Sequence, residues 1–164
     1  MSFTVRPATR ADLPVLGRMG AALARQHHAY DPQRFMLPDD VESGYRGWFG
    51  RELAQDDAVV LVAQAPDGAT LAGYAYGRIE ERDWNALLDR CGGFHDLWVE
   101  EAQRAHGVGG LLAEEMVRRL AALGAPRVVL MSAARNTAAQ RLFARLGWRP
   151  TMVEMTRETG PHRP

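Results

Sequence analysis

The stretch that decides the fold reads FHDLWVEEAQRAHGVGGLLAEEMVRRLAAL, from Phe94 to Leu123. Its first six residues are mostly apolar and predict a β-strand, and a glycine-rich segment follows after a short polar link. Beyond the glycines, apolar residues recur with the period of an amphipathic helix, at Leu111, Leu112, Met116, Leu120 and Leu123. The order is therefore strand, glycine-rich turn, helix.

This order predicts a site for an anionic group. A helix begins with backbone N–H groups that have no acceptor within the helix, and its macrodipole is positive at that end. Glycines just before the helix let a ligand approach the backbone without meeting a Cβ atom. A phosphate is the ligand that such a turn favours.

The spacing of the glycines argues against two common phosphate-binding motifs in this segment. A P-loop places Lys and Ser or Thr after its last glycine, whereas Leu111 and Leu112 follow Gly110. A dinucleotide-binding fingerprint needs Gly or Ala where Leu112 stands, and an acidic residue roughly twenty positions further on, where this chain has Met131 or Ser132. The segment matches neither motif.

The pattern that the chain does carry is Arg-x-x-Gly-x-Gly, formed by Arg104, Gly107 and Gly109 after a strand that ends in LWV at 97–99. It resembles the pyrophosphate loop of the GNAT superfamily of acetyl-coenzyme A-dependent N-acetyltransferases. The opening VRPAT at 5–9, with Asp12 and Leu13, resembles the first strand and helix of that family. The run from 136 to 148 resembles its final helix, so the resemblance covers residues 4 to about 157.

The remaining elements follow from periodicity, turn residues and caps. Further strands are expected at 3–6, 58–64, 70–79, 127–132 and 152–156. Further helices are expected from about 12 to 25, from a cap at Asp39 or Asp40 to about 53, and from a cap at Asn136 to a stop at Gly147. The strand at 127–132 follows the glycine-loop strand through a helix, so the two should be parallel neighbours.

The expected fold class is α/β, or α+β by some schemes. We expect one domain over 1–164, with a core from about 4 to 157 and a mobile tail at 158–164. A mixed, twisted sheet of six to seven strands should be flanked by about four helices, as in the GNAT fold. With 164 residues, the chain is long enough for one buried core and short for two domains.

The amino-acid composition limits the classes of partner that the chain is expected to bind. Twenty Lys and Arg residues balance twenty Asp and Glu residues, so no overall field favours nucleic acid or an anionic membrane. The single Cys91 cannot form an internal disulfide, and neither a secretory signal nor an apolar run of ~20 residues is seen. We therefore expect a cytoplasmic protein. His27 and His28 diverge on a helix and lack a third ligand, so no metal is expected.

The resemblance implies transfer of the acetyl group of acetyl-CoA to a primary amine of a small molecule or peptide, by direct attack in a ternary complex. The backbone of Leu97, Trp98 and Val99 would pair with the pantetheine arm, and the Val99 N–H would point at the acetyl carbonyl. The other residues expected to contact the cofactor are Arg104, Ala105, His106, Gly107, Val108, Gly109, Gly110, Asn136 and Phe143. Phe143 stands where many relatives have a tyrosine that protonates the departing thiolate.

An alkyl ammonium must lose a proton before it can attack. Asp96 on the central strand, Glu80 at the end of the preceding strand, and His95 are the candidate bases, and each has an alternative role as a surface or capping residue. Glu80, Glu81, Asp83 and Asp96 cluster in sequence near the expected acceptor end. This cluster predicts a cationic acceptor, whereas a solvated loop is the plainer interpretation of the acidic run.

The sequence is compatible with two other functions. A CoA-binding sensor or interaction module could keep the same fold without turnover, and Phe143 slightly favours it. A nucleotide-binding α/β module would need NAD or ATP, for which the glycine spacing is unsuitable. A homodimer is suggested by family habit alone.

Overall fold

A computed structural model describes residues 2–160 and contains a five-stranded sheet with four α-helices. The strands are β1 (Thr4–Pro7), β2 (Ala58–Gln64), β3 (Leu71–Glu80), β4 (Cys91–Val99) and β5 (Val128–Leu130). The helices are α1 (Leu13–Tyr30), α2 (Val41–Glu52), α3 (Val108–Ala122) and α4 (Thr137–Arg145), with 3-10 turns at Arg10–Asp12 and Glu101–Gln103.

The strands lie in sequence order, β1-β2-β3-β4-β5. The first four are antiparallel, while β4 and β5 are parallel, as predicted from the helical connection between them. β4 therefore occupies an inner position, with β3 on one side and the short β5 on the other. The expected mixed sheet with four helices is confirmed.

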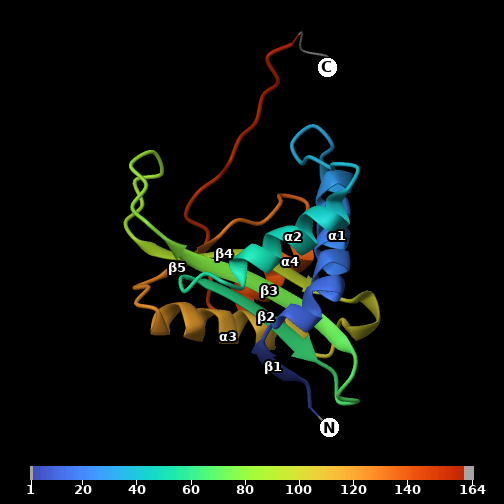
Figure 1. Ribbon diagram of the computed structural model, residues 1–164. Coiled ribbons are helices and arrows are strands. Elements are labelled where there is room, and N and C mark those ends of the chain that lie inside the picture. Colours follow the sequence, from blue (N-terminus) through green and yellow to red (C-terminus); the bar gives the residue numbers. More distant parts are fainter. Residues whose placement is uncertain (1, 161–164) are drawn as a thin grey trace.

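Helices cover both faces of the sheet (Figure 1). Leu112, Met116 and Leu120 of α3 and Phe143 of α4 pack with inward residues of β2 to β4 on one face. On the other face, residues of α1 and α2 pack with an aromatic layer that includes Phe49, Tyr74 and Tyr76. The sheet is thus buried on both sides, and its loops and strand ends remain for chemistry.

The start of α1 shows how the local sequence fixes an element. The Thr9 N–H donates to Asp12 Oδ2 at 2.7 Å, and the Arg6 guanidinium donates to both Asp12 oxygens. These contacts hold the pKa of Asp12 below its usual range, with the Arg6 hydrogen bond as the largest cause. The helix then runs to Tyr30, further than the expected end near Arg25.

Two expectations about the sheet are wrong. It has five strands in the described residues instead of six to seven, because the segment expected as a strand at 152–156 has no strand partner there and each of its residues is exposed. The strand expected at 127–132 shortens to Val128–Leu130. Residues 161–164 of the expected tail lie outside the described part. Within that part, none of the helices is long and apolar enough to cross a membrane.

Candidate functional site

A β-bulge in the middle of β4 organises the site. Tyr76 of β3 is paired with Asp96, but the next residue, Gly77, is paired with Phe94, so His95 is the extra residue. The bulge places two successive side chains on the same face of the sheet: His95 stacks on Tyr76, and Asp96 accepts a hydrogen bond from the Tyr74 hydroxyl. Bulges often redirect side chains in this way beside functional sites.

The same bulge changes which backbone groups face the outer side of β4. Before the bulge, the Gly92 N–H donates across to Arg127 O next to β5, and after it the Glu100 N–H donates back to Ala72 O beside β3. Because backbone groups alternate along a strand, the N–H and C=O of Val99 point away from β3. A hydrogen bond of 3.1 Å from Arg104 Nε to the Val99 carbonyl agrees with this direction.

β5 does not cover that side of β4. The two strands pair only from Gly92 to Phe94 on β4 and from Val128 to Leu130 on β5. β4 continues to Val99, so its outer edge is free of β5 from His95 onward. An extended ligand can therefore hydrogen-bond to the backbone of this segment as an added strand would.

The glycine-rich turn opens directly beside this edge. Ala105 and Gly107 have positive φ angles of 65° and 80°, and α3 starts at Val108 without any side-chain cap. A Cβ atom added at Gly107 or Gly110 would meet no atom within 4 Å, whereas one at Gly109 would lie 3.1 Å from Leu142. The first N–H groups of the helix are thus approachable at Gly107 and Gly110, while Gly109 serves close packing.

Arg104 connects the turn to the strand end. Besides its bond to the Val99 carbonyl, its guanidinium lies over the Trp98 ring, 5.2 Å from the centroid. These contacts hold the turn against β4. His106, also from the predicted set, is exposed and lies near the Phe3 ring.

The final helix contributes one cap and one buried ring. The side chain of Asn136 accepts a hydrogen bond from the Ala139 N–H at 3.2 Å and so caps α4. Phe143 is 9% exposed and packs edge-on against Phe94 and Trp148, with centroids 5.9 and 5.6 Å away. The structure places Phe143 in the core.

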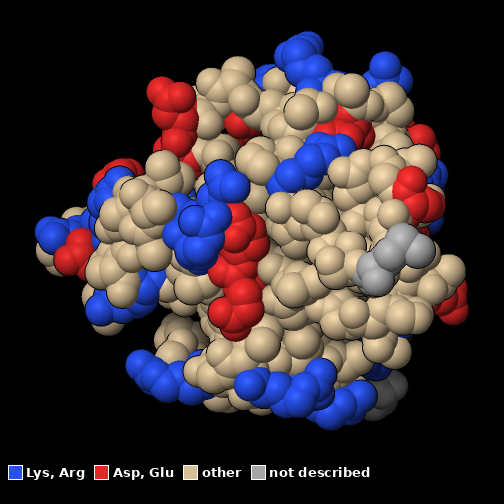
Figure 2. Space-filling model, turned by 90° about the horizontal axis from the view of Figure 1, so that it is seen from below, with Lys and Arg blue, Asp and Glu red and all other residues tan. Residues whose placement is uncertain are grey.

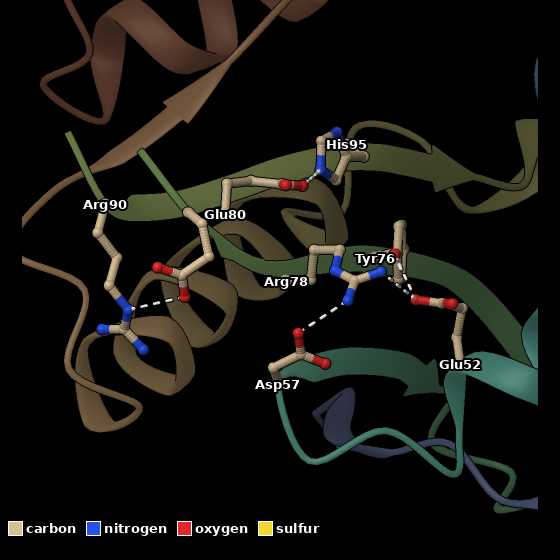
Figure 3. Close-up of polar contacts among 8 residues, drawn as sticks. Glu52, Asp57, Tyr76, Arg78, Glu80, Arg90 and His95 are labelled. Atoms are coloured by element: carbon tan, nitrogen blue, oxygen red, sulfur yellow. Dashed lines mark hydrogen bonds and ion pairs between the residues drawn. The ribbon is translucent and has the colours of Figure 1, made fainter. Parts of the chain in front are cut away.

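Two of the three candidate bases lie together. His95 Nε2 is 2.7 Å from Glu80 Oε1, and both side chains are partly exposed, at 38% and 42% (Figure 3). Tyr76, on which the imidazole stacks, donates its hydroxyl hydrogen to Glu52 Oε2 at 2.6 Å. Because the carboxylate of Glu80 accepts from Nε2, the neutral imidazole carries its proton there, and Nδ1 remains free to accept another.

The third candidate, Asp96, is enclosed. It is 8% exposed, and burial raises its pKa, although the hydrogen bond from Tyr74 partly opposes this effect. The carboxyl group also affects Tyr45, whose pKa is raised mainly by burial and then by the charge of Asp96. Direct contact with an acceptor is therefore far easier for His95 than for Asp96.

Most acidic residues of the run after β3 form contacts within the loop that connects β3 to β4. Glu81 pairs with Arg90 at 3.3 Å, and Asp83 accepts hydrogen bonds from two backbone N–H groups, those of Asn85 and Ala86. Glu80 is the member of the run that contacts the bulge. The solvated-loop interpretation thus describes Glu81 and Asp83.

The sequence interpretation missed several residues of this site. Tyr74 donates a hydrogen bond to Asp96, and Tyr76, which donates to Glu52 of α2, stacks on the His95 ring. These contacts join residues far apart in sequence and leave no local signature. Ser132, just beyond β5, has a buried hydroxyl with no hydrogen-bond partner among the described residues. One signal of the bulge was available: the adjacent polar residues His95 and Asp96 interrupt the alternation of an otherwise apolar strand.

Across residues 2–160, no group of three or more His, Cys, Asp or Glu residues is placed to hold a metal ion. Figure 2 shows basic and acidic side chains scattered over the face below the sheet, with uncharged surface between them. On α3, for example, Glu115 pairs with Arg118 and Arg119 at 2.5 and 2.6 Å.

Comparisons with known proteins agree with this geometry. The sequence model of the Acetyltransferase (GNAT) family matches residues 23–148. No curated protein matches the chain. Among solved structures, a mutant BH1408 protein from Bacillus halodurans is similar with a TM-score of 0.80 and 18% identity, covering 94% of this chain and 98% of its own.

Two further structures carry names that describe their activity or ligand. A GCN5-related N-acetyltransferase from Ralstonia eutropha has a TM-score of 0.71 and 22% identity, with 97% of this chain and 100% of its own covered. AAC(6')-Iy, in complex with the bisubstrate analogue CoA-S-monomethyl-acetylneamine, has a TM-score of 0.73 and 17% identity over 98% of this chain and 100% of its own. At these identities the likeness shows the fold.

Proposed function

The chain belongs to the GNAT acetyltransferase family, and from this premise we propose that it transfers the acetyl group of acetyl-CoA to a primary amine of a small molecule or peptide. The observation that carries the proposal is the free outer edge of β4 from His95 to Val99, which opens beside the uncapped start of α3. A strand edge and a helix start, placed together, suit a ligand with an amide-containing arm and a pyrophosphate.

The residues present fit acetyl-CoA. The turn from Ala105 to Gly110 offers backbone N–H groups to the pyrophosphate, with open space at Gly107 and Gly110. Leu97 and Val99 offer backbone groups to the pantetheine arm, and the Val99 N–H is the proposed donor to the acetyl carbonyl oxygen. When bound, acetyl-CoA supplies the activated acetyl thioester.

His95 is the proposed proton acceptor for the attacking ammonium. Its Nδ1 is free because Nε2 is engaged by Glu80, and stacking on Tyr76 fixes the plane of the ring. An alkyl ammonium has a pKa of about 10.4, so a positioned base is needed at neutral pH. Glu80 stabilises the imidazolium that forms, in the role of a positioning residue.

The acceptor is proposed to be cationic before reaction. Glu80 contacts the proposed base and attracts positive charge at short range. Asp96, the next residue after His95, is a buried acid. Glu81 and Asp83 contribute less than their sequence position suggested, because they hold the loop after β3. Polyamines, aminoglycosides, amino-acid amides and peptide N-termini are the acceptor classes to compare with neutral aryl amines.

The test is release of the CoA thiol from acetyl-CoA when each amine of this panel is added. Release that depends on a cationic amine supports the proposal. Binding of acetyl-CoA without release for any amine would instead support a CoA-binding sensor, which the absent hydroxyl at Phe143 favours. Tighter binding of NAD or ATP than of acetyl-CoA would contradict both interpretations.

A further inference from the structure

The face of the His95 ring is covered by a tyrosine whose hydroxyl group is itself held in place. Tyr76 stacks on the imidazole with 5.6 Å between the ring centroids and 29° between the ring planes. Its hydroxyl group donates to Glu52 Oε2 at 2.6 Å (Figure 3), and the Trp48 ring packs against it with centroids 4.7 Å apart. Glu52 is the last residue of α2, so this hydrogen bond ties the end of that helix to the ring that contacts His95.

Glu52 is a costly residue at this place. It is 7% exposed, and a carboxylate loses hydration on burial, which is unfavourable unless partners compensate. Besides the Tyr76 hydroxyl, its partner is Arg78 at 3.5 Å, which also pairs with Asp57 at 2.8 Å. A contact needed only for packing would not require a charge, because Phe49 already packs against the Tyr76 ring. The buried charge therefore points to a role beyond packing.

The imidazole is also confined at one edge. Glu80 Oε1 lies 2.7 Å from His95 Nε2. A Cβ atom added at Gly93 would lie 2.7 Å from the same nitrogen and 2.9 Å from the Glu80 Cγ, so a glycine is needed to leave room for the pair. The ring is thus bounded at this edge by Glu80 and Gly93 and on one face by Tyr76, and its Nδ1 is left for the acceptor.

We propose that Glu52 is a positioning residue for His95 and that it acts through Tyr76. The inference rests on the function proposed above, in which His95 takes a proton from the attacking ammonium. The hydrogen bond to Glu52 fixes the Tyr76 ring, and this ring fixes the plane of the imidazole. A phenol that donates to a carboxylate also gains electron density in its ring, and the face of such a ring attracts a cation. Glu52 therefore adds to the effect of Glu80 in stabilising the imidazolium.

The imidazole faces titratable groups on two strands. Glu80 and Tyr76 of β3 contact it, and Asp96 follows it on β4 and interacts with its charge. From α2, Glu52 reaches it through Tyr76. Burial, and then the hydrogen bond to Glu52, raises the pKa of Tyr76, so the hydroxyl group keeps its hydrogen and remains a donor at neutral pH.

The first test measures release of the CoA thiol across pH, with the cationic amine that reacts fastest. Glu52→Gln keeps an acceptor for the Tyr76 hydroxyl but removes the charge. It should lower kcat about 10-fold with little change in the KM for acetyl-CoA. The acid limb of the kcat profile should move to lower pH, because a less stabilised imidazolium loses its proton more readily. Asp12→Asn is the matched control: Asp12 is also 7% exposed and paired with an arginine, and its loss should leave kcat and the acid limb unchanged.

A double-mutant cycle tests the route through the tyrosine. Tyr76→Phe keeps the stacked ring but loses the hydrogen bond to Glu52, so it should have an effect similar to that of Glu52→Gln. The double variant should be little worse than either single variant. Circular dichroism verifies that each variant is folded. Effects of the two substitutions that simply add would overturn the proposal.

The second test needs no turnover. The NMR signal of the His95 Cε1–H, assigned by its loss in His95→Ala, is followed against pH in the free protein. Its midpoint should move to lower pH in Glu52→Gln and in Tyr76→Phe, and should stay in place in Asp12→Asn. A parent that turns over, with unmoved titrations in the first two variants, would overturn the role of Glu52 alone. A parent that releases no CoA with any amine would instead overturn the proposed function, and the role of His95 with it.

Discussion

His95 Nε2 lies 2.7 Å from Glu80 Oε1, although fifteen positions separate the two residues in sequence. The antiparallel pairing of β3 and β4 brings them together, and the bulge at His95 puts the imidazole on the face of Tyr76. This arrangement fixes which imidazole nitrogen is free, because a carboxylate can only accept. It gives the first prediction.

His95→Ala should lower kcat by about 10²–10⁴-fold, the usual worth of a general base, with little change in the Kd for acetyl-CoA. Glu80→Gln should lower kcat less, because the amide oxygen still accepts from Nε2 but no longer stabilises the imidazolium. Steady-state release of the CoA thiol measures both effects.

The matched control for these variants is Asp89→Asn. Asp89 is an exposed acid in the same β3–β4 connection, paired with Arg82, and its loss should leave kcat unchanged. An unchanged kcat for His95→Ala would exclude His95 as the base and turn attention to Asp96.

Gly110→Glu should abolish binding of acetyl-CoA in calorimetry, because it puts a carboxylate at the start of α3, where the pyrophosphate is proposed to bind. A Cβ atom at Gly110 meets nothing within 4 Å, and an acid in the first turn of a helix is favourable, so the fold should tolerate the change. Gly44→Glu is the control: Gly44 also lies in a helix and faces open space. Equal affinity for the two variants would place the pyrophosphate elsewhere.

Much of the fold was predictable because its signals are local. The start of α3 follows from Gly107 and the apolar period after it, and the cap at Asn136 follows from its side chain. The parallel pairing of β4 and β5 follows from the helix that connects them, because two strands joined through a helix are usually parallel neighbours. These elements are set by residues close together in sequence.

The site was less predictable because its contacts join distant residues. The hydrogen bond between Tyr76 and Glu52 spans 24 positions, and the one between Tyr74 and Asp96 spans 22. The prediction of a strand at 152–156 was wrong for a related reason. The alternation and strand propensity of the segment are local, but a strand forms only where the segment pairs with the edge of a sheet. The described part of its own chain does not pair with it.

Asp96 should make the free energy of unfolding fall as pH rises. Burial raises its pKa in the folded state, so between the unfolded value of about 3.9 and the folded value the native state binds more protons than the unfolded state. The stabilisation that this proton gives is fully present below the unfolded value and is lost as pH rises through the folded value. The advantage in melting temperature of Asp96→Asn over the parent should therefore grow from acid to neutral pH.

Asp89→Asn is the control of opposite sign for that titration. The hydrogen bond from Arg82 lowers the pKa of Asp89, so its contribution to stability is present above the unfolded value and is lost on acidification. Its neutral variant should lose stability relative to the parent as pH rises. Parallel pH dependences for the two variants would contradict the burial of a charged group at Asp96.

Phe143→Ala should lower the free energy of unfolding by about 3–5 kcal/mol, because it leaves a cavity between Phe94 and Trp148, and Phe143→Leu should cost less. Chemical denaturation measures both.

The effect of Phe143 on turnover is a separate matter. The ring has no hydroxyl, so it cannot donate a proton to the departing thiolate. A thiolate is a tolerable leaving group, and a single general acid is worth about 10²–10⁴-fold, so the parent should turn over with a competent amine. Phe143→Tyr should then change kcat only modestly, since the added hydroxyl enters an aromatic cluster. Release of the CoA thiol across pH compares the two proteins. A silent parent with an active Tyr variant would show that the fold still needs a general acid at this position, and would favour the sensor interpretation of the natural chain.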